Sequence, residues 1–223
     1  MAPGLVCALA LALLALLPGC GAGQRYDQAI GVLVDVSGTY ADRKGATVDL
    51  IKREILPHLE PGDTLLVVRI DSESYGDENL EALLTLDRRP SHANAQKLAV
   101  AARLDEFAAR PESSRHTDIP GALMLASEYL REIGAGSSAL VVFSDLEEDL
   151  PRGARRTLRA DELAGTRVVA MNVKRLAADT VDPDVFRRRL ASWEERAKDA
   201  GALEWRTLMD ASKLPDYLEA IRS

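Results

Sequence analysis

Short apolar runs alternate with longer stretches of helical periodicity along most of this chain. The run 30–34 is largely β-branched and has no polar alternation, which is typical of a strand buried on both faces of a sheet. Comparable runs predict further strands at 64–70, 80–86, 139–143, 168–173 and 203–208. Apolar residues at helical spacing predict helices over 43–58, 91–110, 119–133, 182–200 and 214–221. Strands that alternate with helices in this way favour an α/β fold with an open sheet.

One connection departs from this alternation. The strand at 80–86 follows the strand at 64–70 after a short polar segment, which leaves no room for a crossover helix. We therefore expect 80–86 to run antiparallel, at the edge of the sheet. The helix at 91–110 would then lead the chain back, so that the loop 111–118 lies beside the carboxyl end of the first strand.

Polar side chains follow the first strand at every second position. Asp35, Ser37 and Thr39 stand in the sequence Asp-Val-Ser-Gly-Thr, in which Gly38 allows a sharp turn. Open α/β sheets bind their ligands at the carboxyl ends of the strands. A cluster of hard oxygens at such a place suits a small divalent cation such as Mg²⁺. An ordinary Asp/Ser/Thr helix cap would use the same residue types.

Two later residues are expected at the same end of the sheet. Thr117 lies in the loop 111–118, and Asp145 comes directly after the strand at 139–143. The topology thus brings Asp35, Thr117 and Asp145 together, although they are far apart in the sequence. The mixed-charge segment 147–159 that follows is expected to be a solvated face.

The first 19 residues differ in composition from the rest of the chain. They contain no Asp, Glu, Lys or Arg, and their apolar run 5–17 is too short for a comfortable bilayer span, which indicates a secretory signal. Only the terminal amine supplies the positive charge that usually begins such a signal. The sequence Leu17-Pro18-Gly19-Cys20 resembles the lipobox of bacterial lipoproteins, in which the cysteine is lipidated and becomes the new amino terminus. The alternative is an ordinary cleaved signal, with Cys20 as a bystander.

This resemblance sets the expected organisation of the chain. A signal peptide would occupy 1–19, a short tether 20–26, and one domain 27–223. The protein would be exported and held at a membrane of a bacterial cell envelope through a lipid on Cys20. Cys7, the other of the two cysteines, would leave with the signal, so the mature domain would have neither a disulfide nor a thiol nucleophile.

Composition and the aromatic residues add little about function. The formal net charge of −7 argues against nucleic acid as the main partner. Trp193 and Trp205 are expected to pack in the core, and the three histidines are too scattered for a zinc site.

The polar residues at the strand ends together resemble the metal-ion-dependent adhesion site (MIDAS) of von Willebrand factor A (VWA) domains. The resemblance rests on Asp35-x-Ser37-x-Thr39, on Thr117 in the sequence HTDIPGAL, and on Ser144-Asp145 after an apolar strand. It extends over nearly all of 27–222. Thr39 departs from the pattern, because serine is more usual there, but a hydroxyl is retained.

The VWA resemblance implies a Rossmann-like, doubly wound, mostly parallel central sheet with one antiparallel edge strand and helices on both faces. It also implies one Mg²⁺ or Mn²⁺ ion with an open coordination position for an Asp or Glu carboxylate of a partner protein. The residues that would hold the ion, directly or through water, are Asp35, Ser37, Thr39, Thr117 and Asp145. The expected function is protein–protein interaction at the cell envelope rather than catalysis, since no Lys, Cys or His is placed to act as nucleophile or base.

Two other functions remain open at this stage. One is a structural VWA scaffold without an operative metal. The other is a phosphatase of the haloacid-dehalogenase type, because its D-x-D-G-T loop differs by one residue from the segment that begins at Asp35. In that reading Thr117 would bind phosphate, and Asp145 and Asp149 would hold a metal. However, Ser37 replaces the aspartate needed as general acid, and no lysine stands between Thr117 and Asp145 to neutralise the phosphoryl group.

Overall fold

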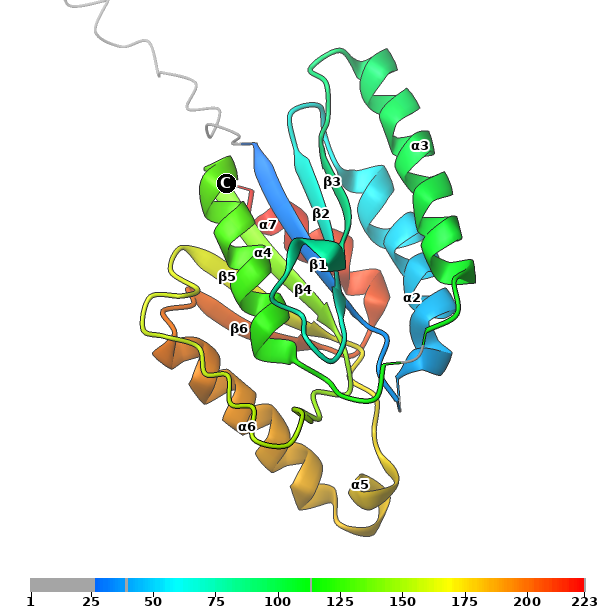
Figure 1. The fold of residues 1–223 in the computed structure, drawn as a ribbon. Coiled ribbons are helices and arrows are strands. Elements are labelled where there is room, and N and C mark those ends of the chain that lie inside the picture. Colours follow the sequence, from blue (N-terminus) through cyan, green and yellow to red (C-terminus); the bar gives the residue numbers. More distant parts are fainter. Residues whose placement is uncertain (1–26, 39, 113, 223) are drawn as a thin grey trace, which may run out of the picture.

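The computed structural model describes residues 27–38, 40–112 and 114–222, which build one six-stranded sheet with helices on both faces (Figure 1). The strand order is β3-β2-β1-β4-β5-β6. All neighbouring strands are parallel except β2 and β3, which are antiparallel. The strands are β1 (Gln28–Asp35), β2 (Thr64–Ile70), β3 (Leu80–Thr85), β4 (Ser137–Phe143), β5 (Thr166–Met171) and β6 (Glu204–Leu208). The predicted fold class and the antiparallel edge strand are confirmed.

The helices form two layers. The α-helices are α2 (Lys44–Leu50), α3 (Pro90–Ala109), α4 (Ile119–Ile133), α5 (Ala177–Val181), α6 (Pro183–Asp199) and α7 (Leu214–Ala220). Helices α2, α3 and α7 pack on one face of the sheet, and α4 and α6 on the other (Figure 1). Alternate residues of β1 supply the two cores, with Ile30 and Val32 in the first and Ala29 and Leu33 in the second. Every residue of β1 is buried, as the apolar run 30–34 within it predicts.

The predicted helix at 43–58 is a composite. A 3₁₀ turn, Ala41–Arg43, leads into α2, and a π-helical segment, Ile51–Ile55, and a 3₁₀ turn, Leu56–His58, follow it. Pro57 offers a reason for the irregular end, because proline has no N–H to donate and its ring crowds the carbonyl four residues earlier. The short helix α5 was not predicted, and the other helices agree with their predictions within one or two residues.

The mixed-charge segment after β4 is mostly exposed, as predicted, but several of its charges form ion pairs. Helix α6 forms ion pairs with it, from Arg189 to Glu147 at 2.9 Å and from Arg196 to Glu148 at 2.6 Å. Arg156 lies 3.0 Å from the carboxylate of Asp118, at the start of α4. The prediction of a solvated face is therefore confirmed for most of the segment, although two helices form ion pairs with it.

Both tryptophans pack as predicted. Trp193, on α6, is buried in the core between the sheet and the helices α4 and α6. Trp205 is partly buried against the same core. Among the described residues, no helix is long and apolar enough to cross a bilayer. The predicted signal, the tether, Cys20 and Thr39 lie outside the described residues.

Candidate metal centre

Asp35 is the last residue of the central strand and is completely buried. Its Oδ1 accepts hydrogen bonds from the backbone N–H of Ser37 at 2.9 Å and from the Ser37 hydroxyl at 2.5 Å. Its Oδ2 accepts a hydrogen bond from the hydroxyl of Ser144 at 2.6 Å. Ser144 follows β4, which pairs with β1, so two adjacent strands hold this carboxylate at the carboxyl end of the sheet.

The segment before α4 reaches the same place. Ser37 Oγ lies 2.5 Å from Thr117 Oγ1, although the two residues are 80 positions apart. Thr117 is held by two backbone hydrogen bonds with Asp149: its N–H donates to the Asp149 carbonyl at 2.7 Å, and the Asp149 N–H donates back at 3.2 Å. The predicted meeting of the first loop with the Thr117 segment is confirmed.

Asp145 completes the described part of the predicted set. It is buried, and its Oδ1 accepts a hydrogen bond from the backbone N–H of Glu147 at 2.9 Å. Its negative charge acts on Asp35, which places the two carboxylates in one electrostatic neighbourhood. The structure thus brings Asp35, Ser37, Thr117 and Asp145 together, and metal binding by them stays a prediction.

Asp35 is a buried carboxylate that has no ion-pair partner among the Lys and Arg residues that the structure describes. Burial raises the pKa of Asp35 to about 6, against the lowering effect of its hydrogen bonds with Ser144 and Ser37. The charge of Asp145 raises the pKa of Asp35 further. Burial also raises the pKa of the neighbouring Tyr40 to about 12, and the charges of both aspartates add to that shift.

This donor set fits a small hard cation. Carboxylate and hydroxyl oxygens are the ligands that Mg²⁺ and Mn²⁺ accept, and a dication would offset the two buried negative charges. The described residues contain no group of three or more His, Cys, Asp or Glu side chains suited to a metal. The site would therefore depend on hydroxyls as well as on its two carboxylates.

Several supporting contacts were not predicted from the sequence. Ser144 orients Asp35 and also accepts a hydrogen bond from the N–H of Leu146 at 2.9 Å. Leu146 is buried and has a φ of 61°, a left-handed conformation that is uncommon outside glycine. The Trp193 indole N–H donates to the Leu146 carbonyl at 2.9 Å, which ties α6 to the residue beside Asp145. A leucine carries no sequence signal for such a turn.

The start of α4 is fixed beside Thr117. Asp118 is the N-cap, and its side chain accepts from the N–H of Gly121 at 2.9 Å and from the N–H of Ser74 at 3.1 Å. His116, the residue before Thr117, is partly exposed, with its Nδ1 2.9 Å from Asp149 Oδ2.

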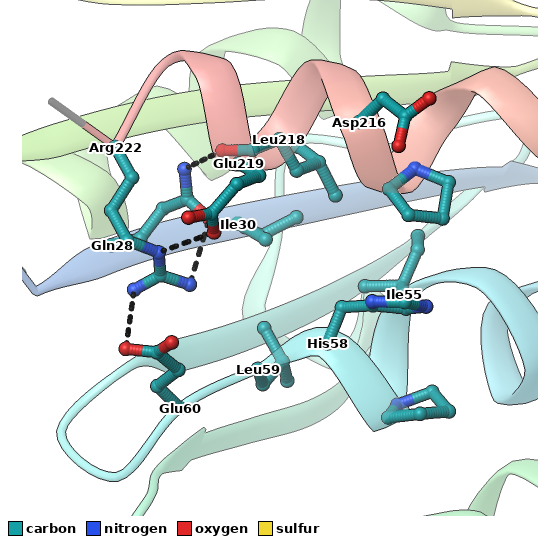
Figure 2. A pocket seen from close by; sticks show the side chains of 12 residues that line it. Gln28, Ile30, Ile55, His58, Leu59, Glu60, Asp216, Leu218, Glu219 and Arg222 are labelled. Carbon is teal, nitrogen blue, oxygen red and sulfur yellow. Dashed lines mark hydrogen bonds and ion pairs between the residues drawn. The ribbon is translucent and has the colours of Figure 1, made fainter.

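The opposite end of the sheet has a different character. A cavity of about 380 Å³ lies there between α7 and the segment that includes His58 and Glu60. Figure 2 shows Arg222 in this cavity, beside Gln28 and Glu60. The guanidinium of Arg222 donates twice to the buried Asp63, at 2.7 Å for each bond.

Comparisons with known proteins bear on the fold. No family model matches the sequence, and no curated protein matches it significantly. Among solved structures, the pilus adhesin SpaC from Lactobacillus rhamnosus GG is similar with a TM-score of 0.51 and 14% identity, over 89% of this chain and 30% of SpaC. An aerotolerance-related membrane protein from Bacteroides fragilis is similar with a TM-score of 0.50 and 14% identity, over 88% of this chain and 98% of that one.

A von Willebrand factor type A structure from Catenulispora acidiphila is also similar, with a TM-score of 0.45 and 12% identity, over 88% of this chain and 42% of that one. This chain spans less than a third of the length of SpaC. At such identities the likeness concerns the fold alone. The fold itself, a six-stranded, mostly parallel sheet with one antiparallel edge strand, is the one expected from the VWA resemblance.

Proposed function

We propose that this protein is a membrane-anchored VWA-domain lipoprotein of a bacterial cell envelope that binds a partner protein through a divalent metal. The metal, Mg²⁺ or Mn²⁺, would be held at a MIDAS and would accept an Asp or Glu carboxylate from the partner. The residues proposed to hold it are Asp35, Ser37, Thr39, Thr117 and Asp145.

One observation carries this proposal: Asp35 is completely buried, and its hydrogen-bond donors are neutral hydroxyls and an amide. A buried carboxylate without a counter-charge destabilises a fold, and its raised pKa expresses that cost. A dication bound beside it would remove the cost.

Each residue has a distinct part in the proposed site. Asp35 and Asp145 supply the two negative charges, while Ser37 and Thr117 supply hydroxyl oxygens 2.5 Å apart. Ser144 keeps the Asp35 carboxylate in its orientation through a hydrogen bond from outside the ligand set. When bound, the ion would provide an electrophilic position for an incoming carboxylate.

The place of the proposed anchor agrees with a binding role. Strand β1 begins at Gln28, just after the predicted tether, and ends at Asp35. Seven residue steps along a strand span roughly 23 Å. A domain tied to a membrane through Cys20 would therefore present the metal centre at the end remote from its point of attachment, where a partner can reach it.

The names of the similar structures support an envelope location. SpaC is a pilus adhesin, and the Bacteroides fragilis protein is named as a membrane protein. At 14% identity neither one identifies a partner for this chain.

Thermal unfolding of residues 24–223 tests the metal site. A ligand that binds only the native state stabilises it by about 3 kcal/mol at a hundred times its dissociation constant. We expect Mn²⁺ and Mg²⁺ to raise the midpoint of the wild type over its value with chelator, and to leave that of Asp35→Ala unchanged. Asp216→Ala is the matched control, because Asp216 is an exposed carboxylate at the opposite end of the sheet.

The outcomes separate the proposal from its alternatives. A metal-dependent rise in Asp35→Ala equal to that in the wild type would refute the assignment of the site. No rise in either protein would favour the metal-free scaffold. Hydrolysis of p-nitrophenyl phosphate that is lost in Asp35→Ala would favour the phosphatase.

A further inference from the structure

A groove lies beside the metal centre, between α2 and the carboxyl ends of β4 and β5. Its volume is about 300 Å³. The floor is buried and consists of Tyr40, Thr47, Leu50 and Phe143. The other lining residues are Arg43, Ala46, Asp49, Arg53, Asn172 and Lys174. We call this the α2 groove.

The α2 groove has three cationic side chains against one carboxylate in its lining. Lys174 lies 3.0 Å from Asp42, and Arg53 lies 2.7 Å from Glu54, so two of the cations have carboxylate neighbours outside the lining. Arg43 is exposed, and among the described residues no carboxylate lies within ion-pair distance of it. The whole chain carries a net charge of −7, so a cationic groove differs from the average surface. Such a groove is complementary to an anionic side chain.

The groove is continuous with the metal centre through Tyr40. Tyr40 forms part of its floor, and the Tyr40 N–H donates to the Ser37 carbonyl at 2.8 Å. Ser37 and Arg43 are six residues apart, which limits the distance between their Cα atoms to roughly 20 Å even in a fully extended chain. One extended segment of a partner can therefore reach both places with side chains no more than about six residues apart.

We propose that the α2 groove binds a second acidic side chain of the same partner segment whose carboxylate reaches the metal. The partner would then carry a motif with two acidic residues, one for the metal centre and one for Arg43 and Lys174. This inference rests on the proposed function and adds the chemistry of the partner. The metal would provide the main attachment, and the groove would select partners with the second acid.

Binding of short peptides to residues 24–223 tests the proposal. The probes are unlabelled ten-residue Gly/Ser peptides with one Glu, or with a second Glu three, four or five positions away. Their affinities are measured by titration calorimetry with saturating Mn²⁺. For at least one spacing, we expect the wild type to bind the two-Glu peptide about five- to tenfold more tightly than the one-Glu peptide, as two partly exposed charge contacts suggest.

A double variant, Arg43→Gln with Lys174→Gln, should reduce this ratio to about two, the value expected from statistics alone. The control, Arg152→Gln with Arg155→Gln, removes the same charge from exposed positions outside the groove and should keep the wild-type ratio. High salt should lower the wild-type ratio, because exposed charges are screened.

The results distinguish failure of the groove from failure of the metal centre. If Mn²⁺ raises the melting midpoint of the wild type and of the groove variant equally, but the peptide ratio is the same in both, the groove proposal is wrong and the proposed function stands. If Mn²⁺ has no effect on the wild type, the proposed function fails. The groove is then judged without metal: tighter binding of the two-Glu peptide by the wild type than by the groove variant supports it, and equal binding overturns it.

Discussion

Two buried aspartates at opposite ends of the same sheet have different charge environments. Asp63 accepts two hydrogen bonds from the guanidinium of Arg222 and one each from the N–H groups of Gln28, at 2.9 Å, and Glu60, at 2.7 Å. Asp35 is equally buried, but its donors are the amide and hydroxyl of Ser37 and the hydroxyl of Ser144. One carboxylate has a cation from its own chain, and the other does not.

The comparison separates a structural carboxylate from a candidate binding carboxylate. The charge of Asp63 is neutralised within the fold by Arg222, whose side chain is itself only 5% exposed. The two residues therefore form a buried ion pair with a structural role. The pKa of Asp35 is raised to about 6 by burial, so its ionised form is disfavoured. A fold keeps such a group at a cost in stability, which is typical of functional sites.

The largest effect is expected when the ion pair between Arg222 and Asp63 is broken. Arg222→Met should lower the free energy of unfolding by about 3–5 kcal/mol, because Asp63 would remain buried without its cation. Urea unfolding measures this, and the loss should be the same with metal and with chelator. Adding Asp63→Asn should recover much of the loss. A double variant no more stable than Arg222→Met would show that the guanidinium acts through packing rather than through charge.

The next effect concerns Asp35 itself. In chelator at pH 8, Asp35→Asn should raise the free energy of unfolding by about 1–3 kcal/mol, because it removes a buried charge. The folded pKa of about 6 lies above the ordinary value of 3.8, so the native state binds the proton more tightly than the unfolded state. This stabilising protonation is complete below about pH 3.8 and is lost as the pH rises through about 6.

The difference between wild type and Asp35→Asn should therefore nearly vanish at pH 4, as urea unfolding at the two pH values would show. With saturating metal at pH 8 the order should reverse, since the wild type alone gains from the ion. A variant that is less stable than the wild type at pH 8 in chelator would mean that the hydrogen bonds of Asp35 outweigh its desolvation.

A smaller effect is expected from α6, the helix that supports the candidate metal centre. Trp193→Phe should lower the free energy of unfolding by about 1 kcal/mol, since it removes one buried hydrogen bond to the Leu146 carbonyl. Metal affinity should fall several-fold, because Leu146 is adjacent to Asp145. The shift of the melting midpoint with Mn²⁺ concentration gives both quantities. Trp205→Phe is the control, because it changes the same residue type against the same core but leaves the hydrogen bond between Trp193 and Leu146 in place.

The smallest effect should come from an exposed cation. Arg152→Ala should leave metal affinity unchanged, because Arg152 is exposed and is not among the residues that hold Asp35 or Asp145. The same titration with Mn²⁺ checks this. A clear change in affinity would mean that the general field of the protein, rather than its placed oxygens, governs the metal centre.

The sequence predicted the order of the elements and the meeting of the strand ends. Apolar runs and helical periodicity located six strands and five helices, and the short connection before β3 identified the antiparallel edge. The boundaries of β5 shifted from 168–173 to Thr166–Met171, because Asn172 turns into the left-handed region with a φ of 47°.

Other features had no local signal. Nothing near Asp63 indicates that Arg222, 159 residues later, neutralises it. The left-handed Leu146 and its hydrogen bond with Trp193 depend on the packing of α6, which no periodicity encodes. The ion pairs of Glu147 and Glu148 with α6 were not predicted for the same reason: charge patterns describe composition, whereas partners come from tertiary structure.

The hydrogen bond between Ser144 and Asp35 joins positions 109 residues apart, and it exists because β1 and β4 are neighbours in the sheet. Closing a loop of that length costs conformational entropy before the strand contacts can offset it. We therefore expect β1 and β4 to pair more slowly than local helices and turns form. A chain that is still being synthesised or translocated lacks the centre until β4 has joined β1. Under the proposed function, an exported chain would bind an ion only after crossing the membrane, and the metal supply of that compartment would decide between Mg²⁺ and Mn²⁺.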